Sequence, residues 1–495
     1  MANKVLIPNR GVIALDVINS LNSLGLETIV LHSPEDSLSL PVRLADKSFK
    51  FFSSRLEDSY MDQDTIIEKA LELGVDYIHP GYGFISERPE FAKACRENNI
   101  GFIGPDYEVL NQARDKVGMK QMAESLDIKT IKYSGKLSSP LDAEGIGDEF
   151  KFPVIIKPVQ GSGGKGIRVA DFKKEAQDHI KDLLKREENQ IGGIFVEEYV
   201  PYGHHIEVPF FRDVKGNILI LPEIESSIQR RFQKIFQESP SPNVTSPMRQ
   251  SIFNATQKLI QKLNYVGLGF VEFIVDGDTA YFSEINPTFQ INTLIPELQL
   301  TANFIKKQFA ISRGELLHDV EGVRIVEPRH HVLLVSLMAE NPDDNFQPSS
   351  GTISEFFHYS AIRNVFKTNL YTGARIPSIY DPYIGKIVTY AVKRENAVRD
   401  LRTFLDNIII RGIHTNLNFL KHLLENHHLQ EGKTINDFIN LKCNYKKRSH
   451  SEESMKVAAA LLAGAFHIDN RKQNYKAQLE KMKQPGFIKR LFSGY

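Results

Sequence analysis

The stretch FPVIIKPVQGSGGKGIRV, residues 152–169, decides the fold that this sequence predicts. Its apolar, β-branched start, Phe152–Ile156, predicts a buried strand that delivers Lys157. Four glycines in six residues follow at 161–166, and Ile167–Ala170 predicts a second strand. Glycine backbones can turn tightly and aim N–H groups at a phosphate, and the lysine adds a positive charge for the same anion. We therefore favour a hairpin loop that covers phosphates over an ordinary glycine-rich turn.

Two common nucleotide-binding motifs do not fit this loop. Its glycines lack the spacing of a Walker A motif, and a strand rather than a long helix is expected after them. The loop therefore argues against a P-loop NTPase and against a Rossmann dinucleotide fingerprint.

The bulk composition is that of an ordinary globular protein. Its length of 495 residues predicts about two to four domains. Lys+Arg and Asp+Glu both number 61, so net charge gives no argument for nucleic acid or membrane as a partner. Only Cys95 and Cys443 occur, which suits a reducing compartment. The N-terminus begins directly with a strand pattern, without a signal-peptide or membrane-spanning run, so we expect a cytoplasmic protein.

Strands and helices alternate through the first hundred residues. The expected strands are Lys4–Ile7, Glu27–His32, Val75–Ile78 and Gly101–Ile103, and the expected helices are Val12–Leu24, Thr65–Leu73 and Pro89–Asn98. This alternation predicts a parallel sheet whose ligands lie beyond the carboxyl ends of its strands. The loop 79–84 follows such a strand, so it either contacts a ligand or is a plain Gly/Pro turn.

The rest of the chain mixes both element types. A helical stretch that contains Asp115 and Lys116 is expected to run to about Leu126. A linker or loop is expected at 134–147, followed by a compact module that ends near Tyr202. Its later elements are the helix Lys173–Glu188 and the strand Gly193–Glu197. Further strands are expected at Ile206–Phe211, Ile218–Ile224, Leu268–Val275, Ala280–Ile285, Val332–Met338 and Lys386–Ala391, and helices at Pro247–Leu263, Glu395–Ile408 and Asn416–Glu425. A basic break at 446–450 precedes a helical tail.

Two acidic residues stand on neighbouring predicted strands. Glu272 and Glu284 flank the tight turn 276–278, so a hairpin can bring both carboxylates to one face at one level. Close carboxylates repel unless a cation lies between them, and oxygen ligands suit Mg²⁺ or Mn²⁺. Asn286 points the same way. The alternative, a solvated acid pair on an edge hairpin, is weakened by the apolar residues around both acids.

Together these features make the ATP-grasp arrangement. The order and spacing of the motifs along the chain resemble those of the biotin carboxylase family. The matching segments are NRGVIA at 9–14, HPGYGFISE at 79–87, FIGP at 102–105, DKVGMK at 115–120, the 152–169 stretch, HHIEV at 204–208, QRRFQK at 229–234, ESPSP at 238–242 and YDPYIGK at 380–386. The resemblance covers about residues 3–445 and implies an α/β and α+β fold. It implies a βαβ N-terminal domain (1–114), an ATP-grasp region (115–312) with a mobile lid at about 133–202, and a mixed C-terminal domain (313–445). A helical tail (446–495) suits docking to a partner.

The resemblance also implies functional residues. Those expected to contact the nucleotide are Lys116, Lys157, Gly161, Gly163, Gly164, Gly166, Glu197, Glu198, Val200, His205 and Gln229. Those expected to hold the metal are Glu272, Glu284 and Asn286, and those expected to hold bicarbonate are Lys234 and Gln290.

The chain departs from the family pattern at positions that serve bicarbonate and biotin in the family. Thr288 replaces an arginine that grips bicarbonate, Asn292 replaces the general-base glutamate, and Ser336 replaces a second arginine that steadies the biotin enolate. The remaining departures are Thr293 and Phe232, both at histidine positions, and Val12 at a glutamate position. A neutral amide accepts no proton at neutral pH, and loss of a transition-state stabiliser can cost roughly a hundredfold in rate. Candidate substitutes are Arg329, His330, Arg363 and Arg375.

One motif is a misleading match. The sequence ESMKV at 453–457 mimics the biotin-carrying lysine motif, but AAALLAGAF follows it and predicts a helix. We therefore expect Lys456 in the first turn of a helix and biotin, if used, on a separate carrier.

Three functional hypotheses remain. The first is a biotin carboxylase subunit that uses ATP, Mg²⁺ and bicarbonate and works with a biotin carrier protein or a carboxyltransferase subunit. The second is an ATP-binding, non-carboxylating paralogue that regulates or scaffolds a carboxylase complex. The third is an ATP-grasp ligase that acts on another carboxylate. The family's habit of forming dimers suggests a homodimer.

Overall fold

The computed structural model describes residues 3–147, 149–161, 164, 166–186, 192–318, 320–359, 362–445 and 476. Contacts divide the chain into a unit at 1–445 and a second unit at 446–495. The expected basic break, the tail helices and Lys456 therefore lie outside the described residues. Within the described ranges, no helix is both long and apolar enough to cross a membrane.

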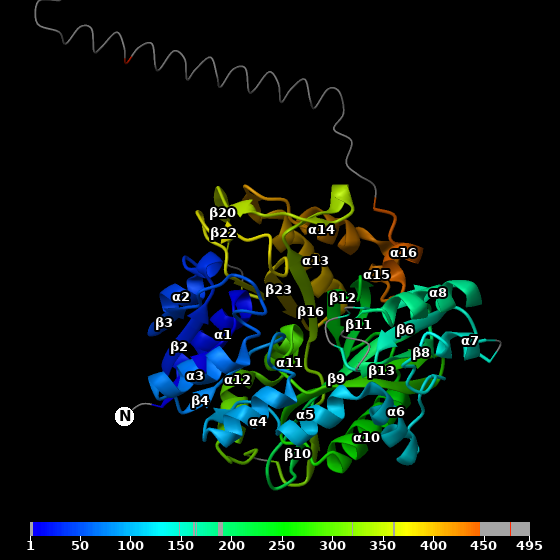
Figure 1. The fold of residues 1–495 in the computed structure, drawn as a ribbon. Coiled ribbons are helices and arrows are strands. Elements are labelled where there is room, and N and C mark those ends of the chain that lie inside the picture. Colours follow the sequence, from blue (N-terminus) through cyan, green and yellow to red (C-terminus); the bar gives the residue numbers. More distant parts are fainter. Residues whose placement is uncertain are drawn as a thin grey trace, which may run out of the picture. The chain divides into compact units, whose positions relative to one another are not determined.

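The N-terminal segment forms a parallel sheet with strand order β3-β2-β1-β4-β5 (Figure 1). Its elements are β1 (Lys4–Ile7), α1 (Gly11–Asn22), β2 (Glu27–His32), α2 (Leu40–Leu44), β3 (Lys47–Lys50), α3 (Gln63–Leu73), β4 (Tyr77–Ile78), α4 (Pro89–Glu97) and β5 (Gly101–Phe102). Asp62 caps α3 by accepting from the Thr65 N–H, and Gly74 ends that helix in the left-handed conformation. The predicted parallel βαβ arrangement is confirmed.

A smaller antiparallel sheet, β7-β6-β8, carries the glycine-rich loop. The elements that lead to it and form it are α5 (Tyr107–Arg114), α6 (Lys116–Ser125), α7 (Asp142–Gly145), β6 (Val154–Pro158), β7 (Arg168–Ala170), α8 (Lys173–Leu183) and β8 (Ile194–Glu198). The loop joins β6 to β7, as the sequence predicts, so it is the tip of a hairpin. Apolar residues of α8 pack beneath this sheet, among them Ala176, Ile180 and Leu183.

A large sheet connects the middle of the chain to its C-terminal part. Its strand order is β14-β13-β9-β11-β12-β16-β23-β21, and neighbouring strands run antiparallel. Its strands are β9 (His204–Arg212), β11 (Ile224–Arg230), β12 (Gln233–Ser239), β13 (Gly267–Asp276), β14 (Thr279–Asn286), β16 (His331–Met338), β21 (Asn364–Thr368) and β23 (Tyr383–Ala391). The sheet therefore runs without a break from the metal-ligand hairpin into the C-terminal region.

The remaining elements include two more strands of this sheet, 218–220 and 323–325, which pair with β9 and with each other. They are β10 (Ile218–Ile220), α10 (Ser246–Lys262), η2 (Ile291–Thr293), α11 (Leu294–Leu300), α12 (Phe304–Ser312), β15 (Val323–Ile325), β17 (Glu340–Asn341), β18 (Gln347–Pro348), β19 (Gly351–Thr352), β20 (Glu355–Phe357), β22 (Arg375–Ile376), α13 (Arg394–Asp406), β24 (Ile409–Arg411), α14 (Leu417–Glu425), α15 (His427–Gln430) and α16 (Phe438–Lys442). Short 3-10 turns are η1 (Pro34–Asp36) and η3 (Pro342–Asp344). One buried cluster joins Val5 of β1, Phe211 of β9 and Val388 of β23, so the three segments share a core.

The structure differs from the expected local structure in three places. Asp115 lies between two helices with an extended backbone, because its carboxylate accepts from the Gly118 N–H and caps α6. The expected linker or loop at 134–147 is mostly loop, with the short helix α7 and a bridge between Leu137 and Ile194 as additions. The expected strand 218–224 is split into β10 and β11 around Pro222, which has no N–H to give to a ladder.

Candidate active site

The phosphate-lysine candidates lie close to buried acids. Lys157 is near the end of β6, and its Nζ lies 2.7 Å from Oε2 of Glu197 on the neighbouring strand β8. The ammonium of Lys120 bonds to the other oxygen of the same carboxylate. Burial raises the pKa of Glu197, but the two lysines outweigh burial and hold it below its ordinary value. The Glu197 side chain is thus committed to these lysines.

Lys116 is the first residue of α6, and its ammonium bonds to Glu284 on β14. Burial lowers the pKa of Lys116, whereas the Glu284 carboxylate more than compensates, so the pKa is raised. This ion pair joins the helix after Asp115 to the acidic hairpin. The lysine and the metal-ligand candidate therefore meet in one place.

The segment expected to contact adenine, 197–200, begins in the last two residues of β8. The Glu198 carboxylate accepts from the Lys151 N–H at 2.9 Å, and the Val200 carbonyl accepts from Asn436 Nδ2 at 2.9 Å. The Glu198 side chain and the Val200 backbone carbonyl thus hold the segment in place. Whether they contact a nucleotide stays a prediction.

Gly164 of the glycine-rich loop lies against the β11–β12 turn. Gly164 has a φ of +71°, and a Cβ built on it would lie 2.8 Å from the Cβ of Phe232. Only glycine suits that backbone at that distance. Gly161 and Gly166 are also described and border Pro158, while Gly163 lies outside the described residues.

The three metal-ligand candidates converge on the hairpin β13–β14. Glu272 and Glu284 are directly opposite in the antiparallel register, as expected from the turn at 276–278. The Nδ2 of Asn286 donates to Oε1 of Glu272 at 2.6 Å. Within the described part of the chain, no three or more His, Cys, Asp or Glu side chains form a metal cluster. The set is two carboxylates and one amide, whose hard oxygens fit a Mg²⁺ that also takes phosphate and water oxygens.

A third acid, which the sequence did not single out, extends this row. Glu207 on β9 is opposite Glu272 on β13, so three carboxylates stand side by side on three strands. Lys234 bonds to Glu207 at 2.8 Å and to Glu272 at 2.6 Å. His205 Nε2 lies 2.6 Å from the other oxygen of Glu272. Burial opposes both charges, but the ion pairs raise the pKa of Lys234 and lower that of Glu272.

The other candidates lie at the same end of the sheet. Gln229 Nε2 donates to the Ser226 carbonyl at 2.9 Å, and Gln290 Nε2 lies 3.3 Å from the Thr288 hydroxyl. The loop 79–84 also reaches this region. Burial raises the pKa of the Tyr82 phenol, and Lys234 and Glu207 are among the charges that act on it. The loop thus lies near the acid–lysine row, and its contact with a ligand stays a prediction.

The residues that depart from the family pattern leave neutral groups here. Asn292 is 2% exposed, and its Nδ2 donates to Oε2 of Glu207 at 3.2 Å. Ser336 is buried on β16, opposite Lys386 of β23 in register. The Lys386 ammonium lies 2.9 Å from the Asp16 carboxylate and 3.2 Å from the Ile291 carbonyl. The lysine nearest to the lost arginine position is therefore neutralised by an acid of α1.

The candidate substitute cations make contacts elsewhere. Arg363 pairs with Asp400 at 3.8 Å and Arg375 with Glu35 at 3.4 Å, and both arginine side chains are more than half exposed. His330 packs edge-on against Tyr390, and the Arg329 N–H donates to Gln299. These contacts give no support to compensation by any of the four.

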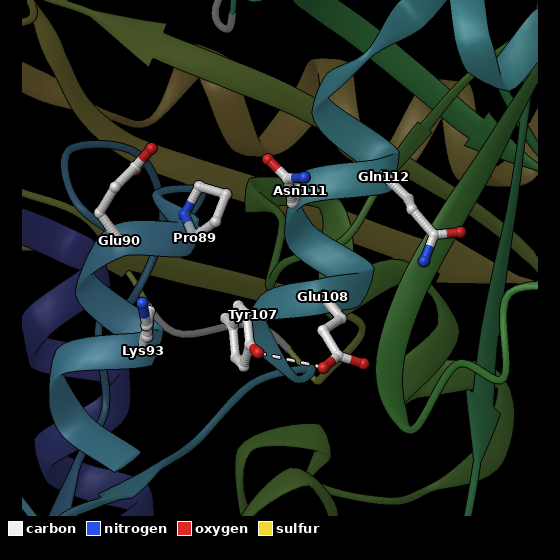
Figure 2. Close-up of a pocket in the computed structure, with 7 residues that line it drawn as sticks. All are labelled: Pro89, Glu90, Lys93, Tyr107, Glu108, Asn111 and Gln112. Atoms are coloured by element: carbon white, nitrogen blue, oxygen red, sulfur yellow. Dashed lines mark hydrogen bonds between the residues drawn. The ribbon is translucent and has the colours of Figure 1, made fainter. Parts of the chain in front are cut away.

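A surface pocket elsewhere lies between α4 and α5 (Figure 2). It is lined by Pro89, Glu90, Lys93, Tyr107, Glu108, Asn111 and Gln112. None of these is a predicted site residue, so this pocket is separate from the acid–lysine row.

A glycine-rich loop between two hairpin strands, lysines and a carboxylate pair on a sheet are the arrangement of an ATP-grasp ligase. Three family profiles match the chain: the biotin carboxylase N-terminal domain at 1–110, the carbamoyl-phosphate synthase L chain ATP-binding domain at 115–320, and the biotin carboxylase C-terminal domain at 335–441. The chain belongs to the biotin carboxylase family and is a biotin-carboxylase-type subunit.

Several relatives share almost the whole chain. Biotin carboxylase 1 of Bacillus subtilis is 34% identical over 445 residues, which are 89% of this chain and 98% of that protein. The mitochondrial methylcrotonoyl-CoA carboxylase subunit alpha of Dictyostelium discoideum is 32% identical over 88% of this chain and 63% of its own length. Relatives thus include both separate carboxylase proteins and parts of larger subunits.

Solved structures agree with the fold. The biotin carboxylase domain dimer of the Hydrogenobacter thermophilus 2-oxoglutarate carboxylase, in complex with MgADP, ADP and bicarbonate, has a TM-score of 0.85 at 29% identity and covers 90% of this chain and 99% of its own. Biotin carboxylase of Campylobacter jejuni, in a β-γ-ATP complex, has a TM-score of 0.83 at 29% identity over 89% of this chain and 99% of its own.

Proposed function

We propose that this chain carries out ATP- and Mg²⁺-dependent carboxylation of biotin on a separate carrier, with bicarbonate as the carboxyl source. The observation that supports it is the row Glu207–Glu272–Glu284, bonded by Lys234 and Lys116 at one end of the large sheet. A row of alternating acids and ammonium groups suits a metal–triphosphate on one side and a small anion on the other.

The proposed chemistry begins at the phosphate side. Lys116 and Lys157 would hold the triphosphate, with the backbone N–H groups of the glycine loop above it. Glu272, Glu284 and Asn286 would hold Mg²⁺, which neutralises phosphate charge when bound. His205 and Gln229 would line the nucleotide pocket, with the 197–200 segment at the adenine.

The acceptor side would hold bicarbonate. Lys234 and Gln290 would fix it so that one of its oxygens attacks the γ-phosphorus, giving carboxyphosphate and ADP. Breakdown of carboxyphosphate to CO₂ and phosphate would leave CO₂ to form a bond with a ureido nitrogen of biotin. The nitrogen must lose its proton. The Asn292 amide cannot take it, so the phosphate released with CO₂ would be the acceptor.

A specific observation favours a second candidate function. Asn292, Thr288 and Ser336 are buried and uncharged at the positions of a base and two arginines, and the Asn292 amide is a donor to Glu207. This arrangement favours an ATP-binding protein that regulates or scaffolds a carboxylase complex, or a ligase that acts on another carboxylate.

The deciding experiment is ATP turnover with and without bicarbonate and free biotin. Stimulation by both supports biotin carboxylation. MgATP binding without stimulated turnover supports the regulatory or scaffolding role, and stimulation by a different carboxylic acid supports the other ligase. The triple variant Thr288→Arg/Asn292→Glu/Ser336→Arg is compared with the wild-type chain in the same assay, because it restores the charged groups of the family pattern.

The finer assignments belong to the same proposal. Residues 133–202 would be the lid, and 446–495 would dock a biotin carrier protein or a carboxyltransferase subunit in the cytoplasm. A homodimer is supported by the dimer of the Hydrogenobacter thermophilus domain.

A further inference from the structure

The small sheet β7-β6-β8 is the main part of the proposed lid, and it has a core of its own. The chain passes between this lid and the rest of residues 1–445, here called the body, at two crossings. At the second crossing, the Tyr199 N–H donates to the Pro153 carbonyl, next to β6, at 2.9 Å. The carbonyl of the following residue, Val200, accepts from Nδ2 of Asn436, next to α16, at 2.9 Å. The hydrogen bonds therefore change from lid to body between two consecutive residues.

The first crossing has a similarly sharp boundary. The Lys129 carbonyl accepts from the Phe282 N–H of β14 at 2.8 Å. Three residues later, the Lys132 carbonyl accepts from the Glu198 N–H of β8 at 3.0 Å. The backbone of the lid thus joins the body at two short hinges, one at 130–131 and one at 199–200. Hinges of moving domains are a few such residues, which absorb the change in backbone angles.

The two residues before α16 hold the second hinge in place. The Asn436 N–H donates to the Gly203 carbonyl at 2.8 Å, and the Asp437 N–H donates to the Pro201 carbonyl at 3.0 Å. Both bonds use backbone N–H groups, which every residue other than proline supplies. The Asn436 side chain supplies the third bond, which is the nearest to the lid. The Val200 carbonyl also accepts from the Gly203 N–H at 3.2 Å, but that bond lies within its own turn.

We infer that Asn436 is a positioning residue, which fixes the second hinge and thereby the position in which the lid closes. Without the side-chain bond, Val200 becomes part of the hinge, and the lid takes a wider range of positions. A smaller share of the molecules is then in the closed, binding-competent state, and the apparent nucleotide affinity falls in proportion. The inference rests on the proposed function, in which this lid closes over the triphosphate, and it adds a residue of the C-terminal segment to that closure.

The first measurement needs no nucleotide. Spin labels on Asp178→Cys of α8 and Lys262→Cys of α10, both at exposed positions, report the lid-to-body distance by double electron–electron resonance. The full chain is used, with Cys443→Ser so that the partly exposed native thiol takes no label. We expect Asn436→Leu, which keeps the approximate size of the side chain but not its donor, to broaden the distance distribution.

MgADP affinity is the second readout. It should fall about fivefold in Asn436→Leu, as the loss of one hydrogen bond implies, and Asn436→Gln, which keeps the donor, should recover part of it. Asn440→Leu is the matched control, because Asn440 lies in α16 and its Nδ2 donates to Oδ1 of Asp437 at 2.6 Å, so both readouts should stay at the wild-type values.

Two results would overturn the inference. One is a distance distribution in Asn436→Leu that equals that of the wild type, and the other is an unchanged MgADP affinity in that variant. A wild-type chain that binds no MgADP would instead count against the proposed function, and the distance measurement would still test the hinge.

Discussion

Glu207 and Glu272 stand directly opposite each other on β9 and β13, and one ammonium group, that of Lys234, bonds to both carboxylates. The same pattern continues on the next strand, where Glu284 is opposite Glu272 and is bonded by Lys116. Adjacent carboxylates would repel in a buried place, so each needs a cation. The row therefore holds positive charge at fixed positions, and removing any member changes the charge felt by its neighbours.

Glu284→Gln should remove most of the benefit of Mg²⁺ for nucleotide binding. The amide keeps the size of the side chain but not its charge, and Lys116 loses its acid. We expect the ratio of ATP affinities with and without Mg²⁺ to fall about tenfold or more, measured by calorimetry. Asp278→Asn, in the exposed turn of the same hairpin, is the control and should leave the ratio unchanged. An unchanged ratio in Glu284→Gln would exclude Glu284 as a ligand.

Lys120→Met and Lys157→Met should have different effects although both lysines bond to Glu197. Lys120 is 1% exposed, so its loss leaves a buried carboxylate half-compensated and should lower the free energy of unfolding by about 3 kcal/mol. Lys157 lies at the loop, and its loss should chiefly weaken ATP binding, roughly tenfold. Adding Glu197→Gln to Lys120→Met should return part of the stability. Equal effects of the two single variants on both readouts would contradict this division of roles.

Gly164→Ala should impair the seating of the glycine loop. The new Cβ would meet Phe232 at 2.8 Å, and the φ of +71° disfavours alanine by about 1 kcal/mol. We expect the KM for ATP to rise several-fold with little change in the thermal midpoint. Gly135→Ala is the control, since no atom lies within 4 Å of its added Cβ. An ATP KM equal to that of the wild type would show that the contact with Phe232 does not matter for nucleotide binding.

Glu297 should make stability fall as pH rises. Burial raises the pKa of Glu297 to about 7, so the folded chain holds a proton there that the unfolded chain releases near 4.5. The folded state therefore binds more protons between those values, and stability is lost as pH increases through about 7, by up to about 3 kcal/mol. Glu297→Gln can still accept from the Phe304 N–H, which lies 2.6 Å away. The thermal midpoint of Glu297→Gln minus that of the wild type should increase from pH 5 to pH 8. A difference that stays constant over this range would contradict the raised pKa of Glu297.

Local features of the site could be predicted from the sequence, and cross-sheet features could not. The glycine hairpin and the Glu272–Glu284 pair each arise from one strand–turn–strand unit, so spacing alone places them. Glu207 was missed as a separate site residue, because its partner Glu272 is far along the chain and nothing in either strand fixes their register. The Asp16–Lys386 pair joins α1 to β23 and was missed for the same reason. The only signal that could have found Glu207 is an acidic residue on a predicted strand that pairs with the strand of a predicted metal ligand.

The unbroken large sheet limits how this protein could diverge from its relatives. Phe236 of β12 pairs with Val335 of β16, so the ladder crosses the boundary between the central and C-terminal family segments. A gene fragment that stopped at residue 320 would leave one edge of β12 unpaired and open to pairing with other chains. The C-terminal segment can therefore be exchanged only for one whose first strand pairs with β12 in the same register.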